Sequence, residues 1–316
     1  MLFTVAYTSF ILLSMWDLKK LKAKILSTKN ITKITNALEI IATLKLQKTK
    51  KQTETMRDYI DVLLPMCRLI NQQARLFWSS KSRDESEETS VTKALHIVVG
   101  TDKWLCWSIN TTLLKDVQTQ ILPHKDVVSI YAVGQKIAQA MQRNWYSVMW
   151  VLQVPDVVTH DALLPLVQFL HESLERETYD TIVVHYNYFK NTMSYIPTHT
   201  QLFPLQESTR IESLRNNQVD WETQEAEKVI EYIIEPTMQD LLQTVRELMM
   251  RFVLYGAILQ GKTSEFASRM LAMKSAKDNA INIVNDLTIA FNKARQDSIT
   301  QEVLEIVSAK SVIESM

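Results

Sequence analysis

The residues best placed to do chemistry are an aspartate and a lysine that directly follow an apolar run. Asp102 and Lys103 come after Val98-Val99-Gly100-Thr101. A carboxylate beside an amine at the end of a strand could act as an acid–base pair. A phosphate site at the same place needs more glycine, and neither a GxGxxG nor a Walker pattern follows the run. An enzyme that uses Asp102 and Lys103 as a catalytic pair therefore stays as an alternative. Detectable nucleotide binding by the isolated chain would support it.

The histidines and cysteines do not have the spacing of a metal site. The six histidines have no HExxH-like or paired pattern, which favours no metal and no cofactor. Cys67 and Cys106 are the only cysteines, lie far apart, and predict neither a disulfide framework nor a thiol-regulated bridge. We therefore expect neither a metal site nor a disulfide at these residues. The histidines are His96, His124, His160, His171, His185 and His199.

The elements that would position these residues begin with two long helices. Neither Gly nor Pro occurs from Trp16 to Leu64 or from Lys262 to Met316. A helix over the second stretch would be roughly 80 Å long, and it needs a partner of similar length. Apolar residues in both stretches recur every three or four positions, with a slip near Thr28, which predicts a long antiparallel coiled coil. The expected stripes are Leu18, Leu21, Ile25, Ile31, Ile34, Leu38 and Ile41 in the first helix, and Phe266, Met270, Met273, Ala276, Ala280, Ile283, Leu287, Ala290 and Ala294 in the last.

Between these helices, short apolar runs alternate with helical patterns. The runs at 94–99, 127–133, 148–152 and 181–185 predict strands, and 110–122, 135–143 and 163–176 predict helices between them. A last strand is expected near 200–205. This alternation predicts an inserted Rossmann-like α/β domain with a mostly parallel sheet, so that the fold class is a helical coiled coil plus an α/β domain.

Composition shifts mark the domain boundaries. Residues 1–15 carry no charge and form an apolar extension, too short to span a bilayer and without the basic start of a signal peptide, so Met15 is an alternative start. The N-terminal coiled-coil helix is expected over 16–78 and a polar linker over 79–92. The α/β domain takes 93–206, and 207–316 hold a connecting segment and the C-terminal helix, with a break near Pro236.

Charge is balanced overall but unevenly placed. The net charge is zero; basic residues outnumber acidic ones between Met15 and Asp58, and the reverse holds from Trp221 onward. The two helices could therefore attract one another or face a charged partner. The basic helix has no interleaved aromatic residues, which argues against nucleic-acid binding.

Dense motifs in these segments resemble the gamma subunit of F-type ATP synthases, from about Leu18 to Ala309. The strongest block lies in the last helix, with further matches in the first helix and at the end of the α/β region. The matching runs are Ile25, Ser27, Lys29-Asn30 and Lys33-Ile34-Thr35-x-Ala37; Tyr186-Asn187-x-Phe189-Lys190 and Gln201-Leu202-Phe203-Pro204-Leu205; and Ala267-Ser268-Arg269-Met270, Ala272-Met273-Lys274, Asp278-Asn279-Ala280, Asn292-Lys293-Ala294-Arg295-Gln296 and Ile299-Thr300-Gln301-Glu302.

The resemblance implies a rotor shaft in a hetero-oligomer, with no active site and no catalytic residues of its own. Its partners would be the alpha and beta subunits of the catalytic head, the epsilon and delta subunits and the membrane c-ring. Rotation of the shaft would couple proton or other ion flow to ATP synthesis or hydrolysis. The chain would be peripheral on the cytoplasmic face of a bacterial inner membrane or, alternatively, on the matrix side of a mitochondrial one.

The resemblance also implies which residues meet partners. Arg269, Gln296, Thr300 and Glu302 match family residues that bond to loops of the alpha and beta subunits, and Lys29 and Lys33 would meet acidic loops. A solvated helix face is the plainer interpretation of each residue by itself.

Departures from the family pattern lie at a few positions. Trp104 and Trp107 stand where the family has glycine in its Asp-Arg-Gly-Leu-Cys-Gly run, and Ser308 replaces a terminal glycine. Together with the apolar extension at 1–15, they motivate the rival hypothesis, a non-rotary coiled-coil scaffold derived from the same stalk fold.

Overall fold

The computed structural model describes residues 2–78, 93–106, 108–121, 128–176, 178–203 and 237–314. Two helices of 77 residues each, α1 (Leu2–Trp78) and α5 (Met238–Glu314), enclose the remaining elements in the sequence. The chain divides into a terminal unit, Met1–Ile41 with Met270–Met316, and a central unit, Ala42–Arg269. The predicted linker, the connecting segment, Pro236 and Trp107 lie outside the described residues.

The central unit contains a five-stranded sheet in the order β3-β2-β1-β4-β5. The strands β1 (Ala94–Val99), β2 (Val128–Val133), β3 (Val148–Leu152) and β4 (Thr181–Asn191) are parallel. Strand β5 (Ser194–Phe203) runs antiparallel to β4 and begins earlier than predicted. The turn before it is closed by Asn191, whose Oδ1 accepts from the backbone N–H groups of Met193 and Ser194 at 2.9 and 2.8 Å.

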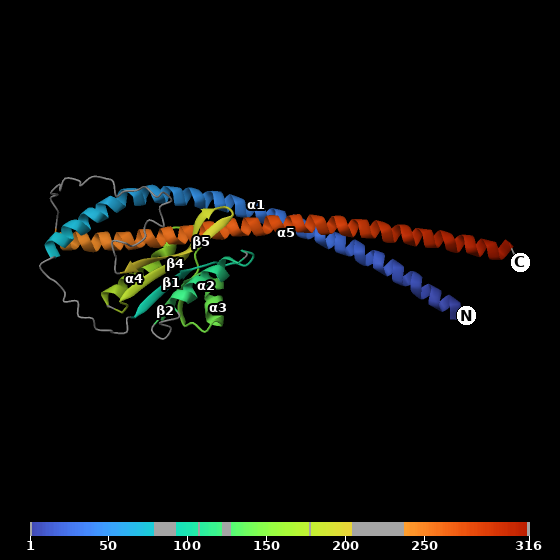
Figure 1. The fold of residues 1–316 in the computed structure, drawn as a ribbon, viewed down its shortest axis with the longest axis horizontal. Helices are drawn as coiled ribbons and strands as arrows, with labels where there is room; N and C mark the ends of the chain where they lie inside the picture. The colour runs from blue at the N-terminus through green and yellow to red at the C-terminus, as the bar shows by residue number, and fades with distance from the viewer. Residues whose placement is uncertain are drawn as a thin grey trace. The chain divides into compact units, whose positions relative to one another are not determined.

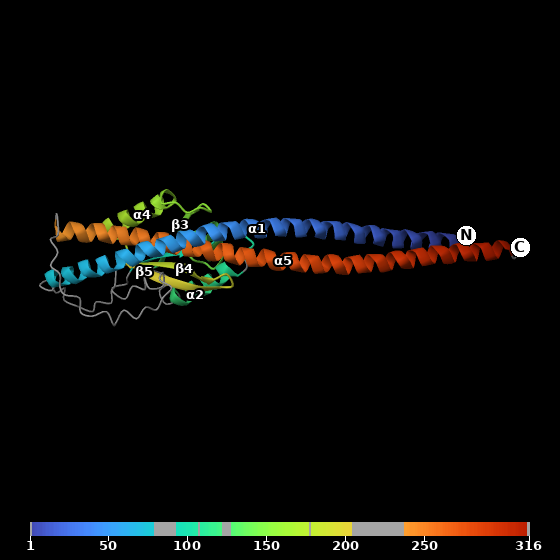
Figure 2. The same ribbon diagram turned by 90° about the horizontal axis from the view of Figure 1, so that it is seen from above.

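The helices between the strands lie on both faces of the sheet. They are α2 (Ile109–Ile121), α3 (Gln135–Arg143) and α4 (Leu164–Glu175), the last preceded by the short turn η2 (Asp161–Leu163). One buried cluster joins α2 and α3 to one face, through residues such as Leu113, Val117 and Ile137. A second joins α4, α5 and Met56 of α1 to the other face, as the two views of the ribbon allow the reader to follow (Figures 1 and 2).

Two glycines in the central unit sit where a side chain does not fit. Gly134, between β2 and α3, has φ +119°, and a Cβ there would meet the carbonyl oxygens of Gly100 and Thr101 at 2.9 Å. Gly261 lies within α5, and its Cβ would meet Cγ1 of Val99 at 2.9 Å. Helix α5 therefore approaches strand β1 more closely than any larger residue would allow.

The buried faces of the long helices differ from the predicted stripes. On α1 the less exposed positions continue through Thr28, Thr32 and Thr35 without a slip, whereas Ile31 and Ile34 are 49% and 59% exposed. Each of these threonines donates its hydroxyl to the carbonyl four residues earlier, which makes the side chain compatible with a packed face. The predicted members that lie off this face are Ile31, Ile34 and Ile41.

Helix α5 shows a similar shift of its packed face. Ile283 is 49% exposed and Ala290 is exposed, whereas Val284 and Phe291 are partly buried. The less exposed positions from Met273 to Glu305 recur at intervals of three and four residues. This is the period of a heptad seam.

Candidate functional site

In the loop after β1, the side chains of Asp102 and Lys103 do not form an acid–base pair, because they contact different residues. Asp102 accepts hydrogen bonds from Nζ of Lys262 at 3.1 Å and from the backbone N–H of Gln135 at 3.0 Å. Lys103 instead donates to Asp156 at 3.1 Å. The two side chains therefore bind separate partners, and each fixes the loop to a different element.

A row of buried charges ties this loop to α5. Lys262 and Glu265 are 3% and 1% exposed, and their Nζ and Oε2 atoms lie 3.6 Å apart. Glu265 also accepts from Arg269 at 2.6 Å, and the other end of the row is the Lys262–Asp102 pair. Breaking a buried pair leaves a charge without its partner, at a cost of several kcal/mol. The row therefore holds α5 against the loop in one register.

At one end of this row of charges, Arg269 contacts Cys106. Arg269 donates to its Sγ at 2.6 Å, and Ser268 donates to the Cys106 carbonyl, also at 2.6 Å. Burial, with the charge of Glu265, raises the pKa of the Cys106 thiol to about 12 in spite of Arg269. Burial disfavours the charge of Arg269, but the carboxylate of Glu265 outweighs it, so that the pKa of Arg269 is raised. Cys106 is therefore a protonated structural thiol at neutral pH.

A second set of contacts ties the central part of α1 to the α/β elements. Lys45 of α1 and Lys103 both donate to the carboxylate of Asp156, in the segment after β3. Burial would raise the pKa of Asp156, but hydrogen bonds from the two lysines lower it to about 2. The hydroxyls of Thr53 on α1 and Thr263 on α5 lie 3.3 Å apart in the buried interior.

Further hydrogen bonds run from α5 to the edge of the sheet. Ser264 donates to the carbonyl of Asn187 at 2.9 Å, and Gln260 accepts from the backbone N–H of Phe189 at 3.1 Å. Together with the buried charges, they fasten one stretch of α5, from Gln260 to Arg269, to β4 and to the loop after β1. These contacts fix this stretch of α5 against β4 and the loop, because sliding would break each of them.

The predicted partner-binding residues lie in different places. Gln296, Thr300 and Glu302 are exposed on α5 in the terminal unit, where Glu302 accepts from Ser298 at 3.5 Å. Lys29 and Lys33 are exposed one turn apart on α1. Arg269 belongs to the central unit, with a side chain only 12% exposed and bound to Glu265.

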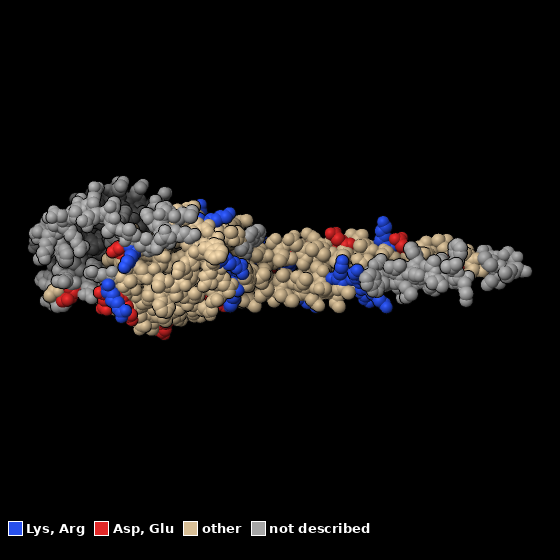
Figure 3. All heavy atoms as spheres, turned by 90° about the horizontal axis from the view of Figure 1, so that it is seen from below, with Lys and Arg blue, Asp and Glu red and all other residues tan. Residues whose placement is uncertain are grey.

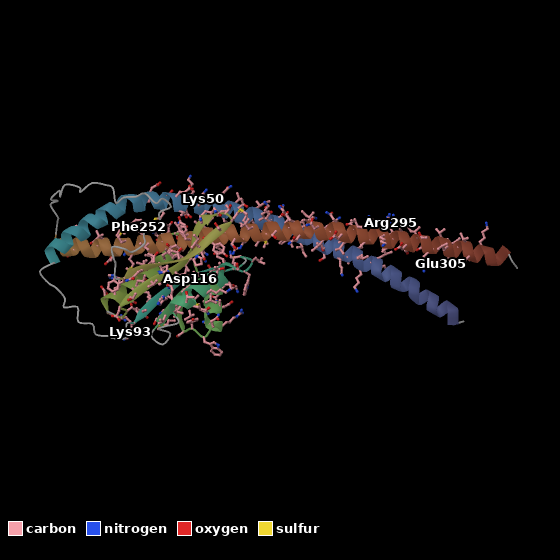
Figure 4. The ribbon with its side chains drawn as sticks, viewed as in Figure 1. Lys50, Lys93, Asp116, Phe252, Arg295 and Glu305 are labelled. Carbon is pink, nitrogen blue, oxygen red and sulfur yellow. The ribbon has the colours of Figure 1, made fainter. Side chains whose placement is uncertain are left out.

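Charges on the outer surface form small separated groups. On the face drawn in Figure 3, Lys/Arg and Asp/Glu side chains alternate with wide areas that carry neither. On the C-terminal part of α5, Arg295 is exposed and Glu305 is partly buried, where Figure 4 labels them. Large apolar side chains are exposed along the same stretch, among them Ile299, Leu304 and Ile306 at 50%, 61% and 69%. This part of α5 therefore leaves several large apolar side chains uncovered.

Sequence reasoning missed the buried Lys262 and Glu265. Charged residues on a long helix are usually solvated, so the general rule for such residues predicts that Lys262 and Glu265 are exposed. Their signal was the spacing Lys262, Glu265, Arg269, which places alternating charges on one helix face at intervals of three and four.

Of the positions that depart from the family pattern, the structure describes Trp104 and Ser308. Trp104 is 61% exposed, with Nζ of Lys136 at 4.5 Å from its ring centroid, an attractive cation–π distance. Leu105 has φ 70°, a backbone conformation that favours glycine. Ser308 is exposed and donates to the carbonyl of Leu304 at 2.8 Å.

Within the described residues, no group of three or more His, Cys, Asp or Glu side chains could hold a metal ion. In the same part of the chain, none of the helices combines the length and the apolar character needed to cross a membrane.

Comparisons with known proteins agree over nearly the whole length. A family model described as ATP synthase matches residues 17–312. The ATP synthase gamma chain of Glaesserella parasuis is 33% identical over 299 residues, covering 93% of this chain and 99% of the relative. The gamma chain of Buchnera aphidicola is 31% identical, covering 95% and 99%.

Solved structures match the fold at lower identity. The central stalk and c-ring structure of the Tetrahymena thermophila mitochondrial ATP synthase contains a chain that is 22% identical with a TM-score of 0.56, covering 77% of this chain and 99% of that one. A chain of the Euglena gracilis mitochondrial ATP synthase is 16% identical with a TM-score of 0.52, covering 89% and 96%. From the match across residues 17–312 and the full-length relatives, we conclude that the chain belongs to the ATP synthase gamma chain family.

Proposed function

We propose that this chain is the central rotor shaft of an F-type ATP synthase. It couples proton or other ion flow through the membrane ring to ATP synthesis or hydrolysis in the alpha/beta head. The observation that carries the proposal is family membership across residues 17–312 in a chain with two helices of 77 residues. Bond chemistry takes place on other subunits, and this chain transmits force.

Within the terminal unit, we propose that residues 2–41 and 270–314 form an antiparallel coiled coil. The less exposed positions on both helices follow a heptad spacing, as such a seam requires. Glu39 of α1 accepts from Lys277 of α5 at 2.6 Å, and Met273 and Ala280 are buried. Small and medium side chains at these positions bring the two backbones close together.

We propose that residues 93–206, within the central unit, form a Rossmann-like domain inserted between the two long helices. Parallel β3-β2-β1-β4 with helices in the connections supports this, although β5 adds an antiparallel edge. The domain boundaries that we propose remain 16–78, 93–206 and 207–316, with 79–92 as a linker and 1–15 as an extension. The buried row from Asp102 to Arg269 would pass torque between α5 and this domain.

We propose partner contacts for the exposed polar residues. Gln296, Thr300 and Glu302 would bond to loops of the alpha and beta subunits, and Lys29 and Lys33 would meet acidic loops. Arg269 would contact a partner only through its exposed edge, because Glu265 and Cys106 occupy the rest of its guanidinium. The exposed apolar residues on α5 would be covered by the sleeve of the catalytic head.

The remaining partners that we propose are the epsilon and delta subunits and the c-ring. The structural relatives include a central stalk solved with its c-ring, which supports that part of the assignment. The chain would be peripheral on the cytoplasmic face of a bacterial inner membrane, since the gamma chains reported above are bacterial, or on the matrix side of a mitochondrial membrane.

The rival is a stalk-shaped scaffold that does not rotate. It is motivated by Trp104, Trp107 and Ser308 at family glycine positions. The test is purification of tagged chain from its native membranes, with subunit identification and an ATP hydrolysis assay. Recovery with alpha, beta and epsilon subunits in an active complex supports the shaft, and recovery without them contradicts it. Failure of the chain to restore coupled synthesis in a stalkless assembly would favour the scaffold.

A further inference from the structure

Three histidines meet on one face of the sheet, away from the contacts of the proposed shaft. His96 lies on β1, His185 on β4 and His199 on β5, where His185 and His199 are directly paired across the strands. The rings of His96 and His185 are stacked with centroids 5.1 Å apart, and those of His185 and His199 are 6.0 Å apart. The three imidazoles therefore form one cluster, which we call the histidine cluster.

The central hydrogen bond of the histidine cluster requires one neutral acceptor. Nδ1 of His96 and Nε2 of His185 are 2.8 Å apart, so one nitrogen donates a proton and the other accepts with its lone pair. His185 is 0% exposed, and its Nδ1 is buried with no hydrogen-bond partner in the described part of the chain. A bare acceptor is tolerated better than a bare N–H, so the arrangement favours His185 Nε2–H as the donor.

An added proton has no favourable place on His96 or His185, the two buried members of the histidine cluster. If it binds Nδ1 of His96, both nitrogens carry N–H and the hydrogen bond is lost. If it binds Nδ1 of His185, a buried N–H has no acceptor. In both cases a cation is created in the interior, which is costly without an anion beside it.

The charged groups around the histidine cluster do not supply such an anion. Strands β1 and β5 contain no Asp, Glu, Lys or Arg, and β4 carries only Lys190, which is exposed. Helix α2 carries the exposed Lys115 and the partly buried Asp116, whose Oδ2 is buried with no hydrogen-bond partner among the described residues; Figure 4 labels Asp116. The charges that act on His96 and His185 come from the other imidazoles of the cluster, which are of the same sign when protonated.

The pKa values of His96 and His185 are lowered, as their burial and mutual contact lead us to expect. Burial, together with His199, lowers the pKa of His96 to about 4. Burial, His96 and His199 hold the pKa of His185 well below its usual value.

The histidine cluster also joins two elements to the sheet. Nε2 of Gln120 on α2 lies 2.8 Å from Nδ1 of His199 on β5. The α2 side chains Val117 and Ile121 are buried on this face. A repulsive cluster would therefore press on α2 and on the edge strand β5 together.

We propose that the histidine cluster is an acid-sensitive latch, which holds α2 and β5 on the sheet while its imidazoles are neutral and releases them when it takes up protons. This goes beyond the shaft function and does not depend on it. Because the unfolded chain binds these protons more readily, stability falls as the pH drops below about 6.5. For one histidine that titrates near 4 in the fold, the folding equilibrium falls about 30-fold between pH 7.5 and 5.0.

The test uses the full chain and its urea unfolding at pH 7.5, 6.5, 5.5 and 5.0. Between pH 7.5 and 5.0 the folding equilibrium constant should fall in both the wild type and the double variant His96→Gln/His185→Gln. The fall in the double variant should be smaller than in the wild type by a factor of at least about 30. The control His160→Gln, at an exposed ring stacked on Tyr255, should keep the wild-type dependence. The same pH dependence in the wild type and the double variant would overturn the proposal.

A second measurement does not depend on the variants folding. Hydrogen exchange of the wild type, corrected for the intrinsic rate, should show tenfold or greater loss of protection in 109–121 and 194–203 at pH 5.0 relative to pH 7.5. Residues 270–314 serve as the internal reference and should change less than twofold. Equal loss along the whole chain, or no loss at α2 and β5, would contradict a latch at the histidine cluster.

Discussion

Replacing Lys262 by methionine should destabilise the chain more than any surface substitution on α5. The Lys262 side chain is 3% exposed and lies 3.1 Å from Asp102 and 3.6 Å from Glu265. Methionine keeps most of the length and the apolar stem but removes the charge. Asp102 then keeps only the backbone N–H of Gln135, while Glu265 keeps Arg269.

The magnitude follows from what is left behind. Removing one partner of a buried pair costs about 3–5 kcal/mol, because the other charge stays buried without compensation. Asp102 is 18% exposed, so some water reaches it, and the lower end of this range applies. We therefore expect Lys262→Met to lower the free energy of unfolding by about 3 kcal/mol.

The assay is equilibrium urea unfolding of wild type, Lys262→Met, Asp102→Asn and the double variant. The loss of unfolding free energy in the double variant should be about 1–3 kcal/mol smaller than the sum of the two single losses, since the double variant removes both charges. Lys274→Met, at an exposed position of the same helix, is the matched control and should change stability by less than about 0.5 kcal/mol. A loss below about 1 kcal/mol for Lys262→Met, with additive single variants, would refute the reasoning.

Three further substitutions probe other contacts of the central unit. Asp156→Asn should cost about 1–2 kcal/mol at pH 7. Because the pKa of Asp156 is lowered from 3.8 to about 2, the wild-type advantage should fade as the pH falls from 4 to 2 in urea titrations, and a constant difference would contradict this. Gly261→Ala should destabilise by about 1–2 kcal/mol in thermal unfolding, because its Cβ would meet the stiff Val99 at 2.9 Å. Adding Val99→Ala should recover part of that loss, and no recovery would place the strain elsewhere. Leu105→Gly should raise stability by up to about 1 kcal/mol, because Leu105 has φ 70°, and a loss would show that its side chain supplies more than its backbone costs.

Strands β1, β2 and β3 were predictable because each is a short, mostly apolar run, whereas β4 continues to Asn191, beyond the predicted 181–185. Such runs are typical of strands covered on both faces, and β1 is buried from Leu95 to Val99. The start of β5 was predicted wrongly, near 200 rather than Ser194. Pro197 interrupts the apolar pattern there, but an edge strand tolerates a proline because its N–H is not needed on the open side.

The packed faces of the long helices could not be found from apolar spacing alone. The isoleucines at 31 and 34 fit a hydrophobic stripe better than the threonines at 28, 32 and 35. Bonding of each threonine hydroxyl to its own helix removes the cost of packing it, a geometric fact that composition does not report. The isoleucines remain exposed, as residues on a partner-covered surface would be.

The candidate site was predictable only where motifs were dense. Family resemblance pointed to Gln296, Thr300 and Glu302, which are exposed on α5, and their role in partner binding stays a prediction. Lys262 and the histidine cluster lay outside those motifs. Their significance depends on which strands become neighbours, and sequence spacing does not determine that.

The most direct test of the central claim is ATP-driven rotation of this chain within the assembled complex. A biotin acceptor peptide placed in the β4–β5 turn, where Met193 is 81% exposed, would carry a bead while the catalytic head is fixed to a surface. The shaft assignment predicts stepwise rotation in one direction that stops when ATP is removed. A complex that hydrolyses ATP at its normal rate while this chain stays stationary would contradict it.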